Sequence, residues 1–317
     1  MIRRRVTLLV GGVLLLAPTA RAQRAVTVRA DNDAFNFWQM PWKRPDEEYT
    51  SGVRLTVSLD GTAAWARRLG WVLGACPQAD PHCATHSYGI GQSIYTAARP
   101  KGGALAMPGG RPDAGVLFVN AASRVTRPSA INELRLTLGV TGEPSLAEPM
   151  QRLFHSLAPR LNRPITWGRQ VPAEPVFSVA FDRRRLVDEG ALQLQPHGGV
   201  SLGTLLTEAR AGLGARYVDE RTLSWILPRQ ASGIALALSG DAQVRAVARN
   251  AVLSGAFFRS GPNVALRPIV PEYTLGLHLQ WRMLEASWLA HQTGAEHVAR
   301  NRPHTWSTLE LTWRPSR

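Results

Sequence analysis

The stretch PSLAEPMQRLFHSL, residues 144–157, places a glutamine and a histidine four residues apart. At about 100° per residue, Gln151 and His155 share one face of a helix. The opposite face carries an apolar stripe of Leu146, Met150, Leu153 and Leu157. Histidine has an ordinary pKa of about 6.5, so a neutral imidazole can accept a proton from water at neutral pH. The pattern allows general-base chemistry, but a solvated polar face explains it equally, and periodicity leaves open which face meets the rest of the protein.

The N-terminus is typical of a secretory signal peptide. Residues 1–22 combine a basic start, an apolar core over residues 6–16, and small residues at Ala20 and Ala22. The apolar run is too short to cross a membrane as a helix. We therefore expect an exported protein in which residues 23–317 form a single domain.

Arginine makes the chain basic. The formal net charge is +14, and four arginines fall within residues 1–22, which leaves +10 for the remainder. Lysine occurs only at Lys43 and Lys101. The planar guanidinium binds pairs of phosphate oxygens, so this composition suits an anionic surface. Because an export signal is present and no nucleic-acid-binding motif is recognisable, we do not expect nucleic acid as a partner.

The two cysteines, Cys76 and Cys83, lie seven residues apart. In an oxidising compartment this spacing favours a local disulfide bond. A zinc site that also uses His82 or His86 is the alternative.

Period-two alternation of apolar and polar residues dominates the chain after residue 23. About twelve segments show it, each long enough for a tilted strand that crosses a bilayer. They are residues 25–35, 52–60, 87–96, 115–123, 132–142, 174–184, 192–203, 207–217, 233–248, 273–283, 284–292 and 305–315. A sheet in lipid can leave no unpaired edge. The pattern therefore predicts an all-β fold, a closed antiparallel transmembrane β-barrel of about 12 strands.

Counting strands from a periplasmic N-terminus brings distant polar residues to one rim of this barrel. The segment with His155 falls between the fifth and sixth strands, so we expect a short helix in an extracellular loop. Asn32 and Asp33 end the first strand, and Thr50 and Ser51 begin the second, at the same rim. The cysteines fall at the opposite, periplasmic rim.

The blocks ADNDAF, DEEYTSG, GIGQSIYTAARP, RPDAG, LGVTGEPSLAEPMQRLFH and WGRQVPAEP follow one another along the chain. In order and spacing they resemble the lipid A 3-O-deacylase family, over nearly the whole of residues 23–317. The resemblance implies a twelve-stranded outer-membrane barrel whose calcium-dependent activity removes ester-linked acyl chains from the 3' position of lipid A. It also implies a site between the outer part of the wall and a helix in an extracellular loop.

The resemblance assigns roles to particular residues. His155 matches the histidine that activates the hydrolytic water, and Gln151 matches the glutamine one turn before it. Asn32 and Asp33 match the family's Asn-Asp pair, and the hydroxyl residue of its YT-x-G turn is Thr50 or Ser51.

Metal and substrate contacts follow from the same resemblance. Ca²⁺ requires oxygen ligands and polarises an ester carbonyl, and Asp33 is the natural charged ligand. Leu161 stands where some family members have a glutamate, and Asn162 aligns nearby as a neutral alternative ligand. Lys101 is expected to contact a phosphate of lipid A.

The sequence thus predicts a monomeric, calcium-dependent carboxylic ester hydrolase in the outer membrane, acting on the lipid A of lipopolysaccharide. Two alternatives remain open. One is a barrel of the same fold that is catalytically weak, or inactive with a structural role. The other is an outer-membrane phospholipase that acts on glycerophospholipids.

Overall fold

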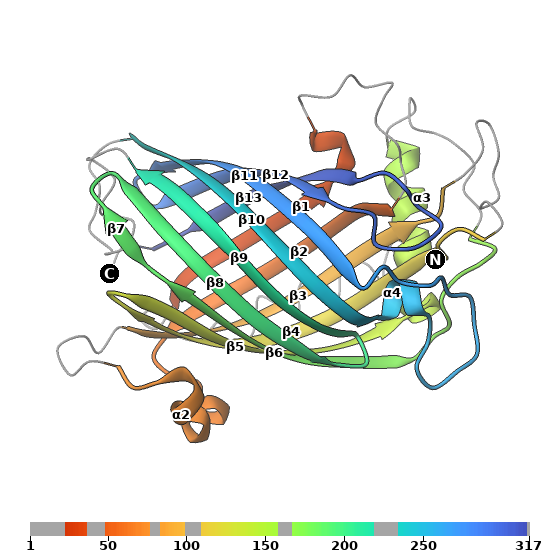
Figure 1. The fold of residues 1–317 in the computed structure, drawn as a ribbon, viewed down its shortest axis with the longest axis horizontal. Coiled ribbons are helices and arrows are strands. Elements are labelled where there is room, and N and C mark those ends of the chain that lie inside the picture. The colour runs from red at the N-terminus through yellow and green to blue at the C-terminus, as the bar shows by residue number, and fades with distance from the viewer. Residues whose placement is uncertain are drawn as a thin grey trace.

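The computed structural model is a closed antiparallel barrel with few helices (Figure 1). It describes residues 23–36, 48–76, 83–98, 109–157, 167–218 and 234–315. Twelve strands form the wall: β1 (Gln23–Asn32), β2 (Glu48–Asp60), β3 (Ala84–Thr96), β4 (Ala114–Arg127), β5 (Ala130–Thr141), β6 (Pro175–Arg185), β8 (Leu192–Gly203), β9 (Leu206–Val218), β10 (Ile234–Asn250), β11 (Ile269–Trp281), β12 (Leu284–Thr293) and β13 (His304–Trp313). The predicted twelve-stranded barrel is confirmed.

One short strand lies outside this prediction. β7 (Val187–Glu189) pairs with β8 alone, while β6 pairs with β8 directly. Three residues are too few for an alternating pattern to be recognised. β7 therefore lengthens one hairpin and does not add a strand to the wall.

The barrel closes where the first strand meets the last. β1 pairs antiparallel with β13, from Val26 opposite Trp313 to Asn32 opposite Ser307. Inside the wall, the hydroxyl oxygens of Thr27 and Thr312 lie 2.9 Å apart across this seam. Each of the twelve wall strands thereby has two neighbours, as the absence of water in a bilayer core requires.

Helices mark the two ends of the barrel (Figure 1). The end that we call the α3 end carries η1 (Asp33–Phe35), η4 (Glu143–Ser145), α3 (Ala147–Leu157) and α4 (Ala251–Ser254). The opposite end, the α2 end, carries η3 (Ala64–Leu69) and α2 (Gly70–Leu73), together with the start of β1 and the end of β13. None of the described helices is both long enough and apolar enough to cross a membrane.

The strands alternate between an apolar outside and a polar inside. Val28, Val53, Val119 and Leu138 belong to a large set of apolar side chains exposed on the outer face. Inside, arginines pair with carboxylates, as when Arg245 contacts Glu208 at 2.7 Å and Glu272 at 2.6 Å. This alternation gives lipid an apolar surface and compensates the buried charges within the lumen.

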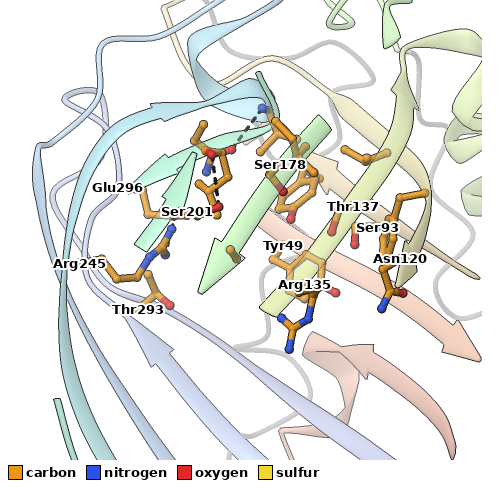
Figure 2. A pocket seen from close by; sticks show the side chains of 18 of the residues that line it. Tyr49, Ser93, Asn120, Arg135, Thr137, Ser178, Ser201, Arg245, Thr293 and Glu296 are labelled. Carbon is orange, nitrogen blue, oxygen red and sulfur yellow. Dashed lines mark hydrogen bonds and ion pairs between the residues drawn. The ribbon is translucent and has the colours of Figure 1, made fainter. Parts of the chain in front are cut away.

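Side chains from many of the wall strands point into the lumen. A cavity of about 340 Å³ remains, lined by residues that include Tyr49, Arg135 and Arg245 (Figure 2). At the α3 end, the apolar residues of α4 pack with Val116 and Phe118, which also line the cavity. The helix α4 therefore occupies the mouth of the barrel and is held there by apolar contacts.

Candidate active site

Helix α3 packs against the outer face of the wall. Ile94 of β3 is buried with Ala147 and Trp167, and Met150 packs against this cluster. The neighbouring Tyr95 lines the lumen, so Ile94 must point outward because side chains alternate along a strand. The helix thus lies on the side of the barrel that faces lipid.

A glycine allows the close approach of α3 to the wall. A Cβ at Gly115 of β4 would collide with the side chains of Ala147 and Ser145. The turn before the helix is fixed further by Gln92 of β3, whose Nε2 donates to the carbonyl oxygen of Ser145 at 2.6 Å. Strands β3 and β4 therefore determine the position of the N-terminal end of α3.

Next to the apolar contacts of Ala147 and Met150, the wall-facing side of α3 also carries a polar side chain. Gln151 is only 3% exposed, and its Oε1 accepts a hydrogen bond from Trp167 Nε1 at 2.8 Å. Its Nε2 has no hydrogen-bond partner among the described residues. His155, one turn later, is half-buried, whereas Leu153 is 49% exposed. The helix thus turns the face with Gln151 toward the wall, a choice that periodicity left open. Leu153, which belongs to the leucine stripe, points away from the wall.

The first two strands bring Asn32 and Thr50 to the same rim. Asn32 pairs with Ser51 of β2. Thr50 lies where the register between β2 and β3 shifts, and its hydroxyl is 2.6 Å from that of Thr96. Both threonines are buried. Thr96 follows Ile94 by two residues on β3 and so shares the outer face on which α3 packs.

Asp33 begins the short helix η1 and is 8% exposed. Asn36 holds this segment against β13: its Nδ2 donates to the carbonyl oxygen of Thr305 at 2.9 Å, and its Oδ1 accepts from Ser307 Oγ at 2.9 Å. The carbonyl oxygen of Phe35 accepts from Trp288 Nε1 at 3.3 Å. These hydrogen bonds therefore fix the segment that contains Asp33 beside the β1–β13 seam.

Five of the predicted site residues thus lie at one rim. Asn32 lies on β1, Thr50 lies on β2, and the helix with Gln151 and His155 packs on β3 and β4. These four strands are neighbours, about 4.8 Å apart from one to the next. Asp33 follows Asn32 directly. The expected signal peptide, Lys101 and Asn162 lie outside the described residues.

The donors at this rim suit a hard cation better than a soft one. Asp33 offers a carboxylate, while Asn32, Thr50 and Thr96 offer neutral oxygens. No group of three or more His, Cys, Asp or Glu side chains suited to a metal occurs among the described residues. Oxygen donors with one carboxylate match the ligand preference of Ca²⁺, whereas a zinc site typically uses several imidazole or thiolate groups and the predicted site residues include one imidazole, that of His155.

The sequence did not predict a buried cluster of ion pairs that lies near the rim. Glu48, the first residue of β2, contacts Arg111 at 2.7 Å, Arg300 at 3.1 Å and His297 at 3.2 Å. These partners come from two different loops, so no periodic pattern could indicate the pairing. The only available signal was that Glu48 stands two residues before Thr50 in the DEEYTSG block.

A second acid, Glu296, lies near this cluster and has a raised pKa. Burial raises the pKa of the Glu296 carboxyl, while the nearby Arg245 and Arg111 lower it. The distance from Arg245 Nη1 to Glu296 Oε1 is 3.6 Å. Together the two acids and their arginines fix the loop between β12 and β13 across the mouth.

Trp167 and Thr96 are two further residues that the sequence did not single out. Each binds a predicted site residue, the first through the Gln151 amide and the second through the Thr50 hydroxyl. Trp167 is the first residue of the WGRQVPAEP block, but its hydrogen bond to Gln151 could not be inferred without knowing where the helix packs.

Comparisons with known proteins agree with this arrangement. The family model described as "Outer membrane protein LpxR" matches residues 6–315. Among solved structures, LpxR from Salmonella typhimurium matches with a TM-score of 0.72 at 15% identity, covering 92% of this chain and 100% of that one. At this identity the likeness shows the fold alone.

Other barrels are less similar. The β domain of the Bordetella autotransporter BrkA gives a TM-score of 0.46 at 10% identity, covering 93% of this chain and 100% of that one. The translocator domain of NalP from Neisseria meningitidis gives 0.42 at 10% identity, with 99% and 95% covered. A search of curated proteins found no match.

Proposed function

Since the chain belongs to the LpxR family of outer membrane proteins, we propose that it hydrolyses a 3'-linked acyl or acyloxyacyl ester of lipid A. At the level of the family, membership implies a lipid A deacylase in the outer membrane. The observation that carries the proposal is the pair of polar residues, Gln151 and His155, that α3 turns toward the wall. Gln151 is buried and His155 half-buried on the outside of the barrel, where a lipid substrate would lie.

We place the α3 end at the outer surface of the cell. The described chain begins and finishes at the α2 end, which suits a barrel inserted from the periplasm. Lipid A lies in the outer leaflet, so its acyl esters would reach the depth of the rim. The packing of α4 in the mouth of the barrel disfavours a passive channel and supports a function on the outer wall.

In the proposed reaction, His155 accepts a proton from water as the water oxygen attacks the ester carbonyl carbon. The negative charge that develops on the carbonyl oxygen needs a hydrogen-bond donor, and Gln151 Nε2 is a buried amide donor on the same side of the helix. When the bond to the sugar oxygen breaks, His155 returns the proton to that oxygen. The products are a fatty acid and a lipid A hydroxyl.

We propose Asp33 as the charged ligand of a Ca²⁺ ion, with Asn32 and Asn162 as neutral oxygen donors. When bound, Ca²⁺ would supply positive charge to the carbonyl oxygen. Thr50 supports the rim through its hydrogen bond to Thr96, which fixes β2 against β3. Lys101 is assigned to a lipid A phosphate, and the protein acts as a monomer.

The decisive experiment compares lipid A from cells that express wild-type protein or His155→Ala. We expect mass spectrometry to show loss of one acyl group with wild type, and a rate about 10²–10⁴-fold lower with the variant. His86→Ala is the matched control, because His86 contacts the Gly61 carbonyl at the α2 end. Full deacylation by folded His155→Ala protein would overturn the assignment of the base.

Calcium dependence is tested separately on purified protein. EDTA should abolish deacylation, added Ca²⁺ should restore it, and Asp33→Asn should require more Ca²⁺ for half-maximal rate. Activity that is indifferent to EDTA would rule out the metal. Measuring phospholipid products in the same samples distinguishes a phospholipase, and the absence of any product distinguishes an inactive barrel.

A further inference from the structure

A helical element packs on the outside of the wall at the α2 end. We call residues 64–76 the η3–α2 element. Ala66 and Leu73 are buried in one cluster with Val125 of β4 and Leu134 of β5. These wall residues point outward, because Val119 and Leu138, which are exposed on the lipid side, lie an even number of positions away. The element therefore covers part of the lipid-facing wall.

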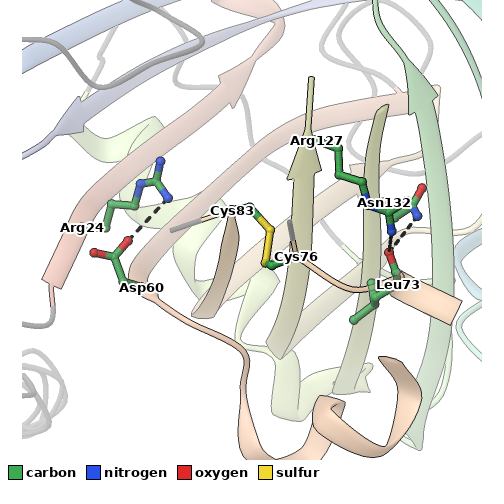
Figure 3. The surroundings of a disulfide bond; sticks show 7 residues. All are labelled: Arg24, Asp60, Leu73, Cys76, Cys83, Arg127 and Asn132. Carbon is green, nitrogen blue, oxygen red and sulfur yellow. Dashed lines mark hydrogen bonds and ion pairs between the residues drawn. A yellow bond between two sulfur atoms is a disulfide. The ribbon is translucent and has the colours of Figure 1, made fainter. Parts of the chain in front are cut away.

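Three connections fix the element in place (Figure 3). Cys76 and Cys83 form the disulfide bond that the sequence predicted. Arg127 Nη2 and Asn132 Nδ2 both donate to the carbonyl oxygen of Leu73, at 2.9 and 2.8 Å. Gly74, with φ +80°, is required beside Arg127, since a Cβ there would overlap the guanidinium. The disulfide bond and the two hydrogen bonds thus hold the element more firmly than a solvated surface loop requires.

The outer side of the element combines an indole with two cations. Trp71 is 83% exposed, and Arg67 and Arg68 are also exposed, three and four residues before it. Such spacing places the three side chains on one side of a helical segment. Tryptophan concentrates at membrane interfaces, and arginine binds phosphate through its guanidinium.

A cleft of about 200 Å³ accompanies this surface. Ala66, Leu73 and Val125 contribute apolar walls, and Arg67 is also among the lining residues. The cleft is apolar, lies beside a cation and adjoins the lipid-facing wall. These properties suit the part of a phospholipid where the phosphate is joined to the acyl chains.

We propose that the η3–α2 element binds an anionic glycerophospholipid of the periplasmic leaflet. Its phosphate contacts Arg67 and Arg68, Trp71 lies at the level of the headgroups, and an acyl chain enters the cleft along Val125. The site is at the opposite end of the barrel from the proposed active site. It depends on membrane insertion and not on the deacylase activity.

Native mass spectrometry of the detergent-solubilised mature protein tests the proposal, with phosphatidylglycerol and phosphatidylcholine as probes. Wild type should bind phosphatidylglycerol more tightly, and Arg67→Gln/Arg68→Gln should weaken this binding roughly thirtyfold. The matched control is Arg152→Gln/Arg259→Gln, which removes two exposed arginines at the α3 end and should leave binding unchanged. Equal binding of the two lipids, or of wild type and the first variant, overturns the proposal.

A second measurement reports the depth of Trp71. In vesicles that contain brominated phosphatidylglycerol, the fluorescence difference between wild type and Trp71→Phe isolates this indole from the other tryptophans. We expect strong quenching of that difference signal. An unquenched Trp71 places the element in water and contradicts the proposal, whatever the affinities show.

Discussion

Two helical segments lie on the outer face of the same region of wall, at opposite ends of the barrel. Helix α3 packs on β3 and β4 at one end, and the η3–α2 element packs on β3, β4 and β5 at the other. Their buried sides differ in chemistry. The η3–α2 element buries Ala66 and Leu73, whereas α3 buries the amide of Gln151 next to Ala147.

This difference indicates that the η3–α2 element serves as an anchor, whereas α3 serves the proposed chemistry. Apolar burial stabilises a contact by about 25 cal/mol per Å², so the η3–α2 element gains stability from its buried side. A buried polar group without a partner costs about 1–3 kcal/mol. Since Gln151 Nε2 lacks a partner among the described residues, α3 accepts this cost at the position where the proposed chemistry needs a donor.

The largest effect is expected from Leu73→Ala. Leu73 is 1% exposed, and its truncation should lower the stability of the docked η3–α2 element by about 2–5 kcal/mol through the cavity it leaves. Hydrogen exchange of the amides of residues 64–76 measures this change. Deacylation should be unaffected, and a parallel loss of activity would contradict the separation of the two ends.

Gly115→Val tests how closely α3 must approach the wall. The new side chain would push against Ala147 and Ser145, so the helix must move outward. A displacement of about 1 Å can cost on the order of 100-fold in rate, and we expect a loss of that size. Lipid A mass spectrometry measures it. Gly240→Val, placed where a Cβ would meet only the Leu275 side chain at 3.8 Å, is the control.

Gln151→Met tests the polar contact itself. The substitution removes the acceptor of the Trp167 indole N–H, so the docked helix should lose about 1–3 kcal/mol. Gln151→Met/Trp167→Phe removes both partners and should recover most of that stability. Hydrogen exchange of α3 measures both changes. If the double variant is no more stable than the single one, the hydrogen bond does not account for the loss.

Leu153→Ser should have the smallest effect. This side chain points away from the wall, and its replacement should change stability by less than about 0.5 kcal/mol. Thermal unfolding in detergent gives the comparison with wild type. A large loss would mean that the leucine stripe, and not the Gln151 face, holds the helix.

Most of the wall was predictable because it obeys one local rule. In a barrel that faces lipid on one side, every strand must alternate, so twelve segments were visible without knowledge of their neighbours. The Cys76–Cys83 bond was predictable for the same reason, since a separation of seven residues makes it a local feature.

Features that depend on tertiary contacts were not predictable. Periodicity gave the angle between Gln151 and Leu153 around the helix axis, but only Ile94 and Trp167 decide which of them faces the wall. The Glu48 cluster joins residues more than sixty positions apart, from loops without any repeating pattern. The sequence indicated Gln151 and His155 as candidates, but it did not indicate Trp167, which binds the Gln151 amide.

The seam between β1 and β13 bears on the timing of biogenesis. Asn32 has β13 as one of its two neighbours, and Asn36, three residues beyond Asp33, is held by Thr305 and Ser307 of the same strand. Strand β13 therefore holds the segment that carries Asp33, although nearly the whole described chain separates β13 from β1 in the sequence. A barrel in which β13 has not yet paired with β1 lacks these contacts, so we expect the proposed hydrolase to become active only when the seam has closed.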